Sequence, residues 1–513
     1  MPDFYRNKNL RYSLIAFLSL LPVLLHLYTN LFAGYGYFRD ELYYLACAGR
    51  PDSGYVDHPP LSVLMLYLLR MITGDSLFAL RLIPALCSGL TVFTASVLTL
   101  RLGGKTFAVI LTSFAVMFTP VFLAMNSYYS MNSIDILLWT IAFYVIVLTV
   151  SENKIIYWLV LGVVFGAGLL NKISFVWLET GFFTGLLISG KKKEFLTVRP
   201  YLTALISIII FSPFIIWNVF NDFAHIEFIQ NATSQKYSHI TVLDFLSGQL
   251  MMMNPVSLII AFTGIYYLLF HAEGRKFSIL CIIFLVTLLI LIINGHSKAE
   301  YLAPAYTALF SAGSVFTEKK TIVRNRWIRY ALLIPLFITG ILTVPLAIPL
   351  LPVESYLSYS DQLGLKPATS EDKELSGLPQ FFADMHGWEK MAENVSSVYM
   401  TLQRDERLRT VVYGRNYGEA AAMEFYRKKY PIPRTVSSHN SYWLWGFPDI
   451  QDPVVIVIGG DKNELLKTFD SVEVAMVHSA EYSMPYENNI PVFIARSFKT
   501  PAAEVWKNAK NYE

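Results

Sequence analysis

Two acidic side chains follow the first apolar segment of the chain, in the run Gly36-Tyr-Phe-Arg-Asp-Glu-Leu-Tyr-Tyr44. Asp40 and Glu41 stand among aromatic residues at a predicted membrane boundary, where carboxylates are costly to desolvate and usually have a partner or a chemical task. Both are therefore candidate functional residues. The alternative is that they are solvated interfacial charges, with the neighbouring Tyr and Phe residues forming an aromatic belt at the membrane surface.

A second candidate is the turn in Gly54-Tyr-Val-Asp-His-Pro-Pro-Leu61. Its two prolines stiffen the backbone and end any preceding helix, so Asp57 and His58 would be held in a fixed turn. A histidine in that position can donate a hydrogen bond to a phosphate or bind a metal ion. An ordinary surface turn explains the same residues and is the favoured interpretation of this pattern alone.

A divalent metal site would need more ligands than this turn provides. His225 and Glu227, in the run Asn221-Asp-Phe-Ala-His-Ile-Glu-Phe228, are the residues that would join Asp57 and His58 around the ion. Scattered His and Glu residues without a diagnostic spacing are a weak signal for a metal. No cofactor is therefore predicted firmly, and a divalent metal is the candidate that stays open.

Asp135 lies near the start of a later apolar segment, in the run Met131-Asn-Ser-Ile-Asp-Ile-Leu-Leu138. Ser133 is the predicted cap of a helix there, and a carboxylate in the first turn would complement the helix dipole. That interpretation explains Asp135 without a function. The functional alternative needs Asp135 to approach Asp40 and Glu41, which the predicted topology permits.

Lys172 and Lys298 are cations on the predicted outer side of the membrane. Lysine and arginine normally concentrate in cytoplasmic loops, so these two residues run against the trend of the chain. Their position is a modest indication of an anionic ligand. Contact with the phosphates of membrane lipids is the alternative explanation.

The elements that would position these residues are mostly membrane helices. The 513-residue chain is 54% hydrophobic and 15% charged, whereas soluble proteins carry about 25% charged residues. The net charge of +3 is too balanced for a nucleic-acid-binding protein. Three scattered cysteines, Cys47, Cys87 and Cys281, form neither a disulfide framework nor a paired metal-ligand spacing. A soluble enzyme, a disulfide-rich secreted module and a zinc-finger protein are therefore excluded.

About eleven apolar segments have the length expected of membrane helices. They are residues 10–32, 77–100, 107–125, 134–150, 155–170, 173–189, 201–217, 255–270, 277–293, 301–316 and 327–351. The first is too long for a signal peptide, so we expect it to remain as a membrane helix. Lys and Arg concentrate in alternate loops, which predicts a cytoplasmic N-terminus, and an odd number of helices then places the C-terminal segment outside.

Two long loops, residues 33–76 and 218–254, lie on the predicted outer side. The first contains an apolar segment, 61–72, that is too short to cross a membrane and suits a helix lying in the interface. Charges return after residue 352, where predicted strands 410–413, 454–458, 472–477 and 490–495 alternate with helices 419–429 and 461–469. We therefore expect residues 1–351 to form a transmembrane module and residues 352–513 a soluble α/β domain.

Taken in order, these motifs resemble one group of enzymes. An Asp-Glu pair after the first membrane helix, a His-Pro-Pro turn in a long outer loop and an Asp opening the fourth helix are similar to the GT-C glycosyltransferases, which use sugars carried on polyprenyl phosphate. The chain resembles in particular the dolichyl-phosphate-mannose protein mannosyltransferases and the bacterial lipid A aminoarabinose transferases. The likeness is strongest over residues 34–175, and segments 413–426 and 438–446 resemble parts of uncharacterised bacterial members.

The resemblance implies a polytopic α-helical membrane protein of GT-C type with a C-terminal extracytoplasmic α/β domain. The implied catalytic residues are Asp40 as general base, Glu41 beside it, and Asp135 as a second acidic residue. The implied substrate-binding residues are Tyr43, Tyr44, Tyr55, Asp57, Pro59, Tyr301, His439, Asn440 and Trp443. The last three would suit carbohydrate, because aromatic faces stack on sugars while Asn and His bond hydroxyl groups. An ordinary packed loop explains them almost as well.

The resemblance also points to the residues that would hold the donor phosphate. His58 stands where the aminoarabinose transferases have a phosphate-binding lysine, so Lys172 and Lys298 become candidates for the same role. Cations are needed at this place because negative charge develops on the leaving phosphate. A carboxylate must also take the proton of the acceptor hydroxyl.

The implied reaction moves a sugar from a polyprenyl-phosphate donor to a hydroxyl group of a lipid, glycan or protein acceptor, in one step that inverts the anomeric carbon. The implied location is the bacterial inner membrane, with the C-terminal domain in the periplasm, membrane lipids as neighbours and no nucleic-acid partner. Two alternatives stay open. A secondary transporter would show repeated halves around a midplane site, and a noncatalytic scaffold or sensor would use the membrane helices only as an anchor.

Overall fold

The computed structural model describes residues 8–236, 239–322, 325–365 and 377–513. The chain divides into two compact units. The helical unit comprises Met1–Ala33, Phe78–Ile216 and His239–Pro352, and the mixed unit comprises Gly34–Leu77, Trp217–Ser238 and Val353–Glu513. The chain is therefore not divided by a single cut at residue 352, because most of the first long loop and part of the second group with the C-terminal segment.

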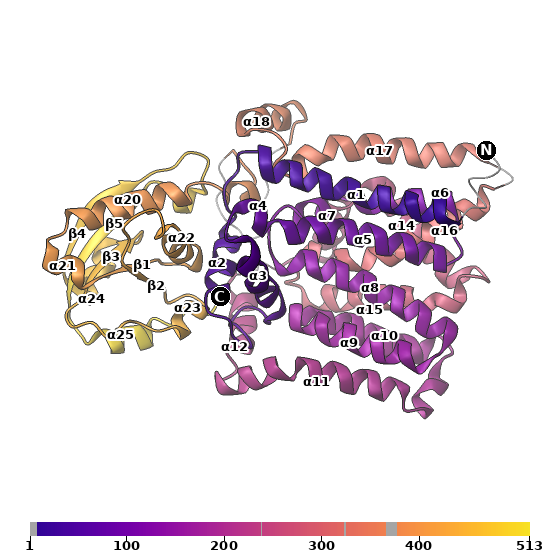
Figure 1. The fold of residues 1–513 in the computed structure, drawn as a ribbon, viewed down its shortest axis with the longest axis horizontal. Coiled ribbons are helices and arrows are strands. Elements are labelled where there is room, and N and C mark those ends of the chain that lie inside the picture. Colours follow the sequence, from indigo (N-terminus) through magenta and orange to yellow (C-terminus); the bar gives the residue numbers. More distant parts are fainter. Residues whose placement is uncertain (1–7, 237–238, 323–324, 366–376) are drawn as a thin grey trace. The chain divides into compact units, whose positions relative to one another are not determined.

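Helices occupy every one of the eleven apolar segments predicted from the sequence (Figure 1). In chain order they are α1 (Lys8–Phe32), α4 (Leu77–Leu80), α5 (Leu82–Arg101), α6 (Thr106–Met117), α7 (Pro120–Met125), α8 (Met131–Glu152), α9 (Ile155–Asn171), η1 (Ile173–Phe175), α10 (Val176–Ile188), α11 (Arg199–Phe220), α14 (Pro255–Phe270), η4 (Arg275–Phe277), α15 (Ser278–Asn294), η5 (Ala299–Ala305), α16 (Tyr306–Lys320) and α17 (Trp327–Ala347). Two helices, η2 (Lys192–Leu196) and α13 (Val242–Met252), lie between these segments.

Not all of these helices are long enough to cross a membrane alone. Within the described ranges, six helical segments have the necessary length and composition, and a seventh is reached if α13 and α14, which meet at a bend of 112°, count as one. Prolines explain two of the interruptions: Pro120 begins α7 and Pro255 begins α14, and a proline cannot continue the preceding helix. The fold is nevertheless that of a multi-pass helical membrane protein.

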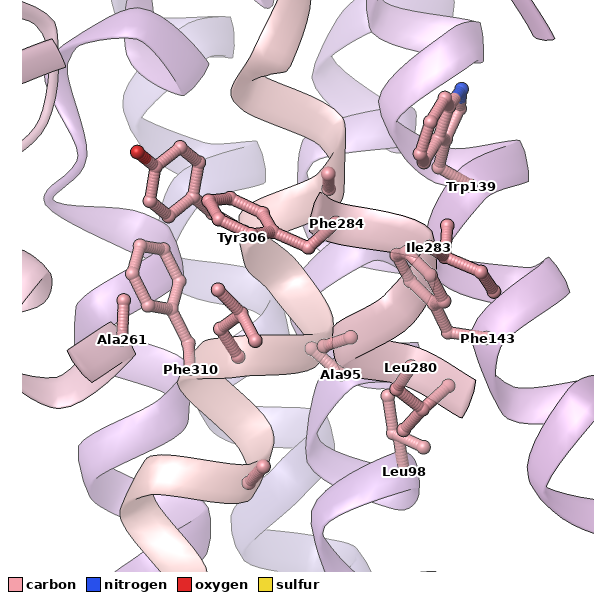
Figure 2. Packing of buried hydrophobic residues seen from close by; sticks show 14 of the residues in the cluster. Ala95, Leu98, Trp139, Phe143, Ala261, Leu280, Ile283, Phe284, Tyr306 and Phe310 are labelled. Atoms are coloured by element: carbon pink, nitrogen blue, oxygen red, sulfur yellow. The ribbon is translucent and has the colours of Figure 1, made fainter. Parts of the chain in front are cut away.

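Buried apolar side chains from five helices pack together in the core of the helical unit (Figure 2). The labelled residues come from α5 (Ala95, Leu98), α8 (Trp139, Phe143), α14 (Ala261), α15 (Leu280, Ile283, Phe284) and α16 (Tyr306, Phe310). The rings of Trp139 and Phe143 meet edge to face at 5.9 Å, and those of Phe284 and Tyr306 at 5.0 Å. This packing gives α8 a fixed position, and α8 carries one of the candidate acidic residues.

Helices α14 and α16 approach so closely that glycine is required at their contact. A Cβ atom at Gly313 would lie 1.9 Å from the carbonyl oxygen of Ile260, and one at Gly264 would lie 2.2 Å from that of Leu309. Small residues at such positions let helix backbones approach each other in membranes. The backbone of each helix therefore leaves no room for a side chain on the other.

We expect Gly313→Ala to lower the free energy of unfolding by about 2 kcal/mol or more, because the added methyl group meets main-chain atoms that cannot rotate away. Thermal unfolding of the detergent-solubilised chain measures the effect. Ile259→Ala is the matched control, since Ile259 lies in α14 but is 51% exposed. An unchanged melting temperature for Gly313→Ala would contradict the close approach of these two helices.

The mixed unit contains a five-stranded sheet in the order β2-β1-β3-β5-β4. Its strands are β1 (Thr410–Tyr413), β2 (Arg434–Val436), β3 (Val454–Ile458), β4 (Phe469–His478) and β5 (Ile490–Phe498). β1 pairs in parallel with β2 and β3, whereas β5 pairs antiparallel with β3 and β4. The four predicted strands are confirmed, and β2 is the strand that the sequence pattern did not indicate.

Short helices surround this sheet and extend into the long loops. They are α2 (Arg39–Ala48), α3 (Leu61–Thr73), α12 (Ala224–Asn231), η3 (Ala232–Lys236), α18 (Val353–Gln362), α19 (Gln380–Ala383), α20 (Trp388–Thr401), α21 (Arg404–Leu408), α22 (Tyr417–Tyr426), α23 (Ser441–Leu444), α24 (Lys462–Thr468), η6 (Pro485–Glu487) and α25 (Ala502–Asn508). The predicted helix 61–72 is present as α3, and it exposes Leu64, Leu68, Met71 and Ile72. An exposed apolar face of this kind suits a membrane interface.

Candidate active site

Glu41 caps the helix on which the acid pair lies. Phe38 precedes α2 in an extended conformation, with φ −70° and ψ 145°, and its N–H donates to Oε2 of Glu41 at 2.8 Å. The Glu41 side chain is fully buried. A carboxylate at this position satisfies one of the free N–H groups that a helix start exposes. The geometry therefore gives Glu41 a contact that holds the start of α2, and the catalytic role implied by the resemblance stays a prediction.

Asp40, by contrast, presents an accessible carboxylate in the first turn of α2. Its side chain is 35% exposed. The hydroxyl of Tyr417 donates to Oδ1 at 2.8 Å, and Nε of Arg39 lies 3.5 Å from the same oxygen. The N-terminus of a helix favours negative charge. A carboxylate held in this way can reach an external proton donor, which Glu41 cannot.

The turn after α2 is not an ordinary surface turn, because His58 is only 2% exposed. The imidazole stacks on the ring of Tyr44 at 4.8 Å and lies 5.0 Å from that of Tyr55. Its Nε2 lies 4.0 Å from Oδ1 of Asp57. The same Oδ1 accepts a hydrogen bond from the hydroxyl of Tyr43 at 2.8 Å.

These contacts bring together six of the predicted residues, namely Tyr43, Tyr44, Tyr55, Asp57, His58 and Pro59. His58 Nδ1 lies 3.1 Å from the carbonyl oxygen of Pro59, which requires Nδ1 to carry the proton. The other nitrogen, Nε2, is buried and has no hydrogen-bond partner among the described residues. Nε2 is therefore the nitrogen of His58 that can still form a hydrogen bond with a ligand.

The four metal candidates do not converge on one point. His225 Nδ1 lies 2.9 Å from the carbonyl oxygen of Val56, and Glu227 forms an ion pair with Lys510 at 2.7 Å. Among the residues that the structure covers, no three His, Cys, Asp or Glu side chains lie close enough to hold a metal ion. Structural and catalytic zinc sites have three or four such ligands, so these residues do not form a site of the zinc type.

Asp135 lies in the helical unit and is not part of a helix cap. Ser130 caps α8, and its hydroxyl accepts from the N–H of Asn132, so the predicted cap at Ser133 is wrong. Ser130 takes the cap because its extended backbone, φ −160° and ψ 173°, precedes the first helical residue. Asp135 consequently lies beyond the first turn, where it is 3% exposed. Its burial needs a different explanation.

That explanation is an ion pair with Lys172. Nζ of Lys172 lies 3.9 Å from Oδ2 of Asp135 and donates to Oδ1 of Asn132 at 2.8 Å. The same ammonium group lies 4.9 Å from the ring centre of Tyr301. Buried charges must be paired because desolvation is expensive. The structure thus brings together three of the predicted residues, Asp135, Lys172 and Tyr301, from three separate segments.

The helical unit contains two further cations. Lys298 directly precedes η5 and is half-buried. It lies close enough to Lys172 for the two positive charges to interact. Arg81, between α4 and α5, is only 1% exposed. It was missed because it stands inside the apolar segment 77–100, although an ionisable residue there is itself a sign of function. The helical unit therefore holds several buried or half-buried cations.

The predicted sugar contacts in the C-terminal segment have other partners. Nε2 of His439 donates to the backbone oxygen of Glu513 at 2.9 Å, and Nδ2 of Asn440 donates to the same oxygen at 3.2 Å. Both side chains are buried. Nε1 of Trp443 donates to the carbonyl oxygen of Trp506 at 3.0 Å. These contacts favour a packing role for all three residues.

Two buried carboxylates lie close to each other in the mixed unit. Nδ2 of Asn416 donates to Oε1 of Glu487 at 2.9 Å and lies 3.2 Å from Oε1 of Glu419. Burial raises the pKa of Glu419 to about 7. Burial also raises the pKa of Glu487, and the charge of Glu419 raises it further. The pair therefore retains protons that an exposed pair would release.

A pH dependence of stability follows from this pair. Both pKa values are higher in the folded chain than the ordinary 4.5, so the folded state binds more protons, and stability falls as the pH rises from 4.5 towards about 7. We expect Glu487→Gln to reduce this fall, as measured by melting temperature across that range. Glu393→Gln is the control, because Glu393 is 48% exposed. Equal slopes for Glu487→Gln and the unmodified chain would contradict the assignment.

Comparison with known proteins identifies relatives of part of the chain. Residues 57–217 match the family model described as dolichyl-phosphate-mannose-protein mannosyltransferase. This segment contains His58, Asp135 and Lys172, whereas Asp40 precedes it. No curated protein matches the chain.

Solved structures show the fold of nearly the whole chain. ArnT from Cupriavidus metallidurans in the apo state superposes on this chain with a TM-score of 0.61 and 13% sequence identity. The structure of ArnT bound to undecaprenyl phosphate superposes with a TM-score of 0.60 and 12% sequence identity. In both cases 93% of this chain and 97% of the other are covered. The Archaeoglobus fulgidus oligosaccharyltransferase tethered with an acceptor peptide superposes with a TM-score of 0.52 and 13% sequence identity. That superposition covers 84% of this chain and 64% of the oligosaccharyltransferase. The chain is therefore a multi-pass membrane protein with the GT-C glycosyltransferase fold.

Proposed function

We propose that this protein is a membrane glycosyltransferase that moves a sugar from a polyprenyl-phosphate donor to an acceptor hydroxyl. The observation that carries the proposal is the accessible Asp40 carboxylate in a chain of GT-C fold. One of the superposed proteins is bound to undecaprenyl phosphate. The match of residues 57–217 to a mannosyltransferase family supports the same class of donor.

In the proposed reaction, Asp40 accepts the proton of the acceptor hydroxyl. The acceptor oxygen forms a bond to the anomeric carbon of the sugar while the bond from that carbon to the phosphate oxygen breaks. The electron pair of the broken bond leaves with the polyprenyl phosphate, and the configuration of the anomeric carbon inverts. General-base help of this kind typically contributes about 100- to 10,000-fold to a rate.

Lys172 is the proposed ligand of the leaving phosphate. Its ammonium group is oriented by Asp135 and Asn132, so its charge is already fixed in place before a substrate arrives. Preorganised charge of this kind stabilises the negative charge that develops on a leaving group. Asp135 then acts through Lys172. Lys298 and the free nitrogen of His58 are the further candidates for phosphate contact.

The proposed setting is the bacterial inner membrane, with a cytoplasmic N-terminus and with transfer on the periplasmic face. The distribution of Lys and Arg among the loops supports this orientation. A donor embedded in the membrane requires no nucleotide-binding domain. The acceptor would be a lipid, glycan or protein hydroxyl presented on that face.

Binding of the carrier lipid tests this proposal without knowledge of the sugar. We expect undecaprenyl phosphate to raise the melting temperature of the purified chain, and undecaprenol, which lacks the phosphate, to raise it much less. A ligand present at 100 times its dissociation constant stabilises a protein by about 2.7 kcal/mol. Equal shifts with the two lipids would show that the phosphate is not recognised and would count against the proposed donor.

A further inference from the structure

Tyr417 joins the C-terminal segment to the proposed base. Its hydroxyl donates to Oδ1 of Asp40 at 2.8 Å, although the two residues are 377 positions apart in the chain. Tyr417 is the first residue of α22 and is 9% exposed, while Asp40 is 35% exposed. A nearly buried donor therefore holds one oxygen of a carboxylate that is open to solvent.

The position of Tyr417 is fixed on several sides. Asn416 caps α22 by accepting from the N–H of Glu419 at 2.9 Å, and the backbone N–H of Tyr417 points to Nδ1 of His439 at 3.4 Å. The ring of Tyr417 lies 4.8 Å from that of Tyr43. Burial, capping and ring packing together leave its hydroxyl little freedom to move.

Arg39 adds a further constraint on the same ring. Its guanidinium carbon lies 5.5 Å from the ring centre of Tyr417. Nη1 of Arg39 donates to the hydroxyl of Tyr486 at 2.9 Å, and Nη2 lies 3.7 Å from Oδ2 of Asp384. The residue next to Asp40 is thus anchored on the C-terminal segment, so Arg39 as well as Tyr417 ties the Asp40 carboxylate to that segment.

We propose that Tyr417 is a positioning residue for Asp40, and that the C-terminal segment thereby completes the active site. This inference rests on the proposed function. A base must meet the acceptor proton in a narrow range of geometry, and an exposed aspartate without a second contact would rotate among rotamers. The hydroxyl of Tyr417 selects one of these orientations and leaves Oδ2 to receive the proton.

Tyr417→Phe tests this inference, because it removes the hydroxyl and keeps the ring packed against Tyr43 and Arg39. We expect kcat for release of polyprenyl phosphate to fall about tenfold, while KM for the donor changes less than about twofold, since an interaction needed only in the transition state affects kcat. Tyr413→Phe is the matched control. It removes a hydroxyl of the same domain that bonds Ser438 at 2.8 Å, and kcat should then stay unchanged.

Carbodiimide labelling of Asp40, read by mass spectrometry, gives a second readout that does not depend on turnover. We expect Tyr417→Phe to increase the labelling rate severalfold and Tyr413→Phe to leave it unchanged. An active wild-type chain with equal kcat in Tyr417→Phe would overturn the positioning role and leave the proposed function standing. A wild-type chain that is inactive with every donor, but shows the change in labelling, would instead reject the proposed function and retain the contact.

Discussion

Asp40→Asn is expected to reduce sugar transfer by about 1,000-fold or more, because the amide cannot accept the proton that general-base catalysis removes. The substitution keeps the size of the side chain and leaves a carbonyl oxygen to accept from the hydroxyl of Tyr417. Folding should therefore be preserved, and the melting temperature should stay close to that of the unmodified chain. Transfer of labelled sugar in membranes that contain equal amounts of each protein measures the effect.

The neighbouring acid provides the control for this prediction. Glu41→Gln retains a side-chain oxygen that can accept from the N–H of Phe38, and glutamine serves in the same capping arrangement. We expect its transfer rate to fall far less than that of Asp40→Asn. If Glu41→Gln lost transfer while Asp40→Asn kept it, the roles assigned to the two acids would be reversed.

The second large effect concerns the buried pair of Asp135 and Lys172. Their side chains are only 4% and 12% exposed, and their charged atoms lie 3.9 Å apart. Removal of one partner from a buried ion pair typically costs about 3–5 kcal/mol, because the other charge is left without compensation. We therefore expect Asp135→Leu and Lys172→Met each to lower the melting temperature strongly.

The double variant shows whether Asp135 and Lys172 stabilise each other as an ion pair or are two buried groups that do not interact. With both charges removed, Asp135→Leu with Lys172→Met should be more stable than either single variant, since apolar replacement of a buried pair is often neutral. The exposed pair of Lys390 and Glu393 is the control, because pairs of that kind contribute about 1 kcal/mol or less. Strictly additive losses in the double variant would show that the two residues do not interact.

Local patterns predicted the fold well. The strands 410–413 and 454–458 appear with the same bounds as β1 and β3, because short runs of β-branched and aromatic residues need no distant partner to be recognised. The helix 61–72 was predicted from a local pattern as well, a continuous apolar segment too short to cross a membrane. β2 was missed because it has only three residues and begins with Arg434. A pattern of that length is too short to reveal a strand.

Contacts between distant segments were harder to predict. The sequence pointed to Asp40 but not to Tyr417, because 377 residues separate them and no spacing rule connects a loop acid with a tyrosine at the start of a helix. Lys172 and Asp135 were both recognised, yet only the structure shows them as a pair. Long-range partners depend on packing, which the order of residues does not display.

Residue type alone does not decide between a sugar contact and a packed loop. His439 and Asn440 carry groups that commonly bind hydroxyls, but in the folded chain both bond the backbone of Glu513. Buried polar groups are nearly always satisfied by the protein itself. An aromatic and polar segment therefore indicates a binding surface only when its side chains are also exposed.

The most direct measurement follows the release of free undecaprenyl phosphate from purified protein supplied with a panel of labelled undecaprenyl-phosphate sugars. We expect one or more donors to yield free carrier and a labelled acceptor with inverted anomeric configuration, and Asp40→Asn to yield neither. Equal release by the unmodified chain and Asp40→Asn, or a product with retained configuration, would contradict the role of Asp40 as the base for a single displacement.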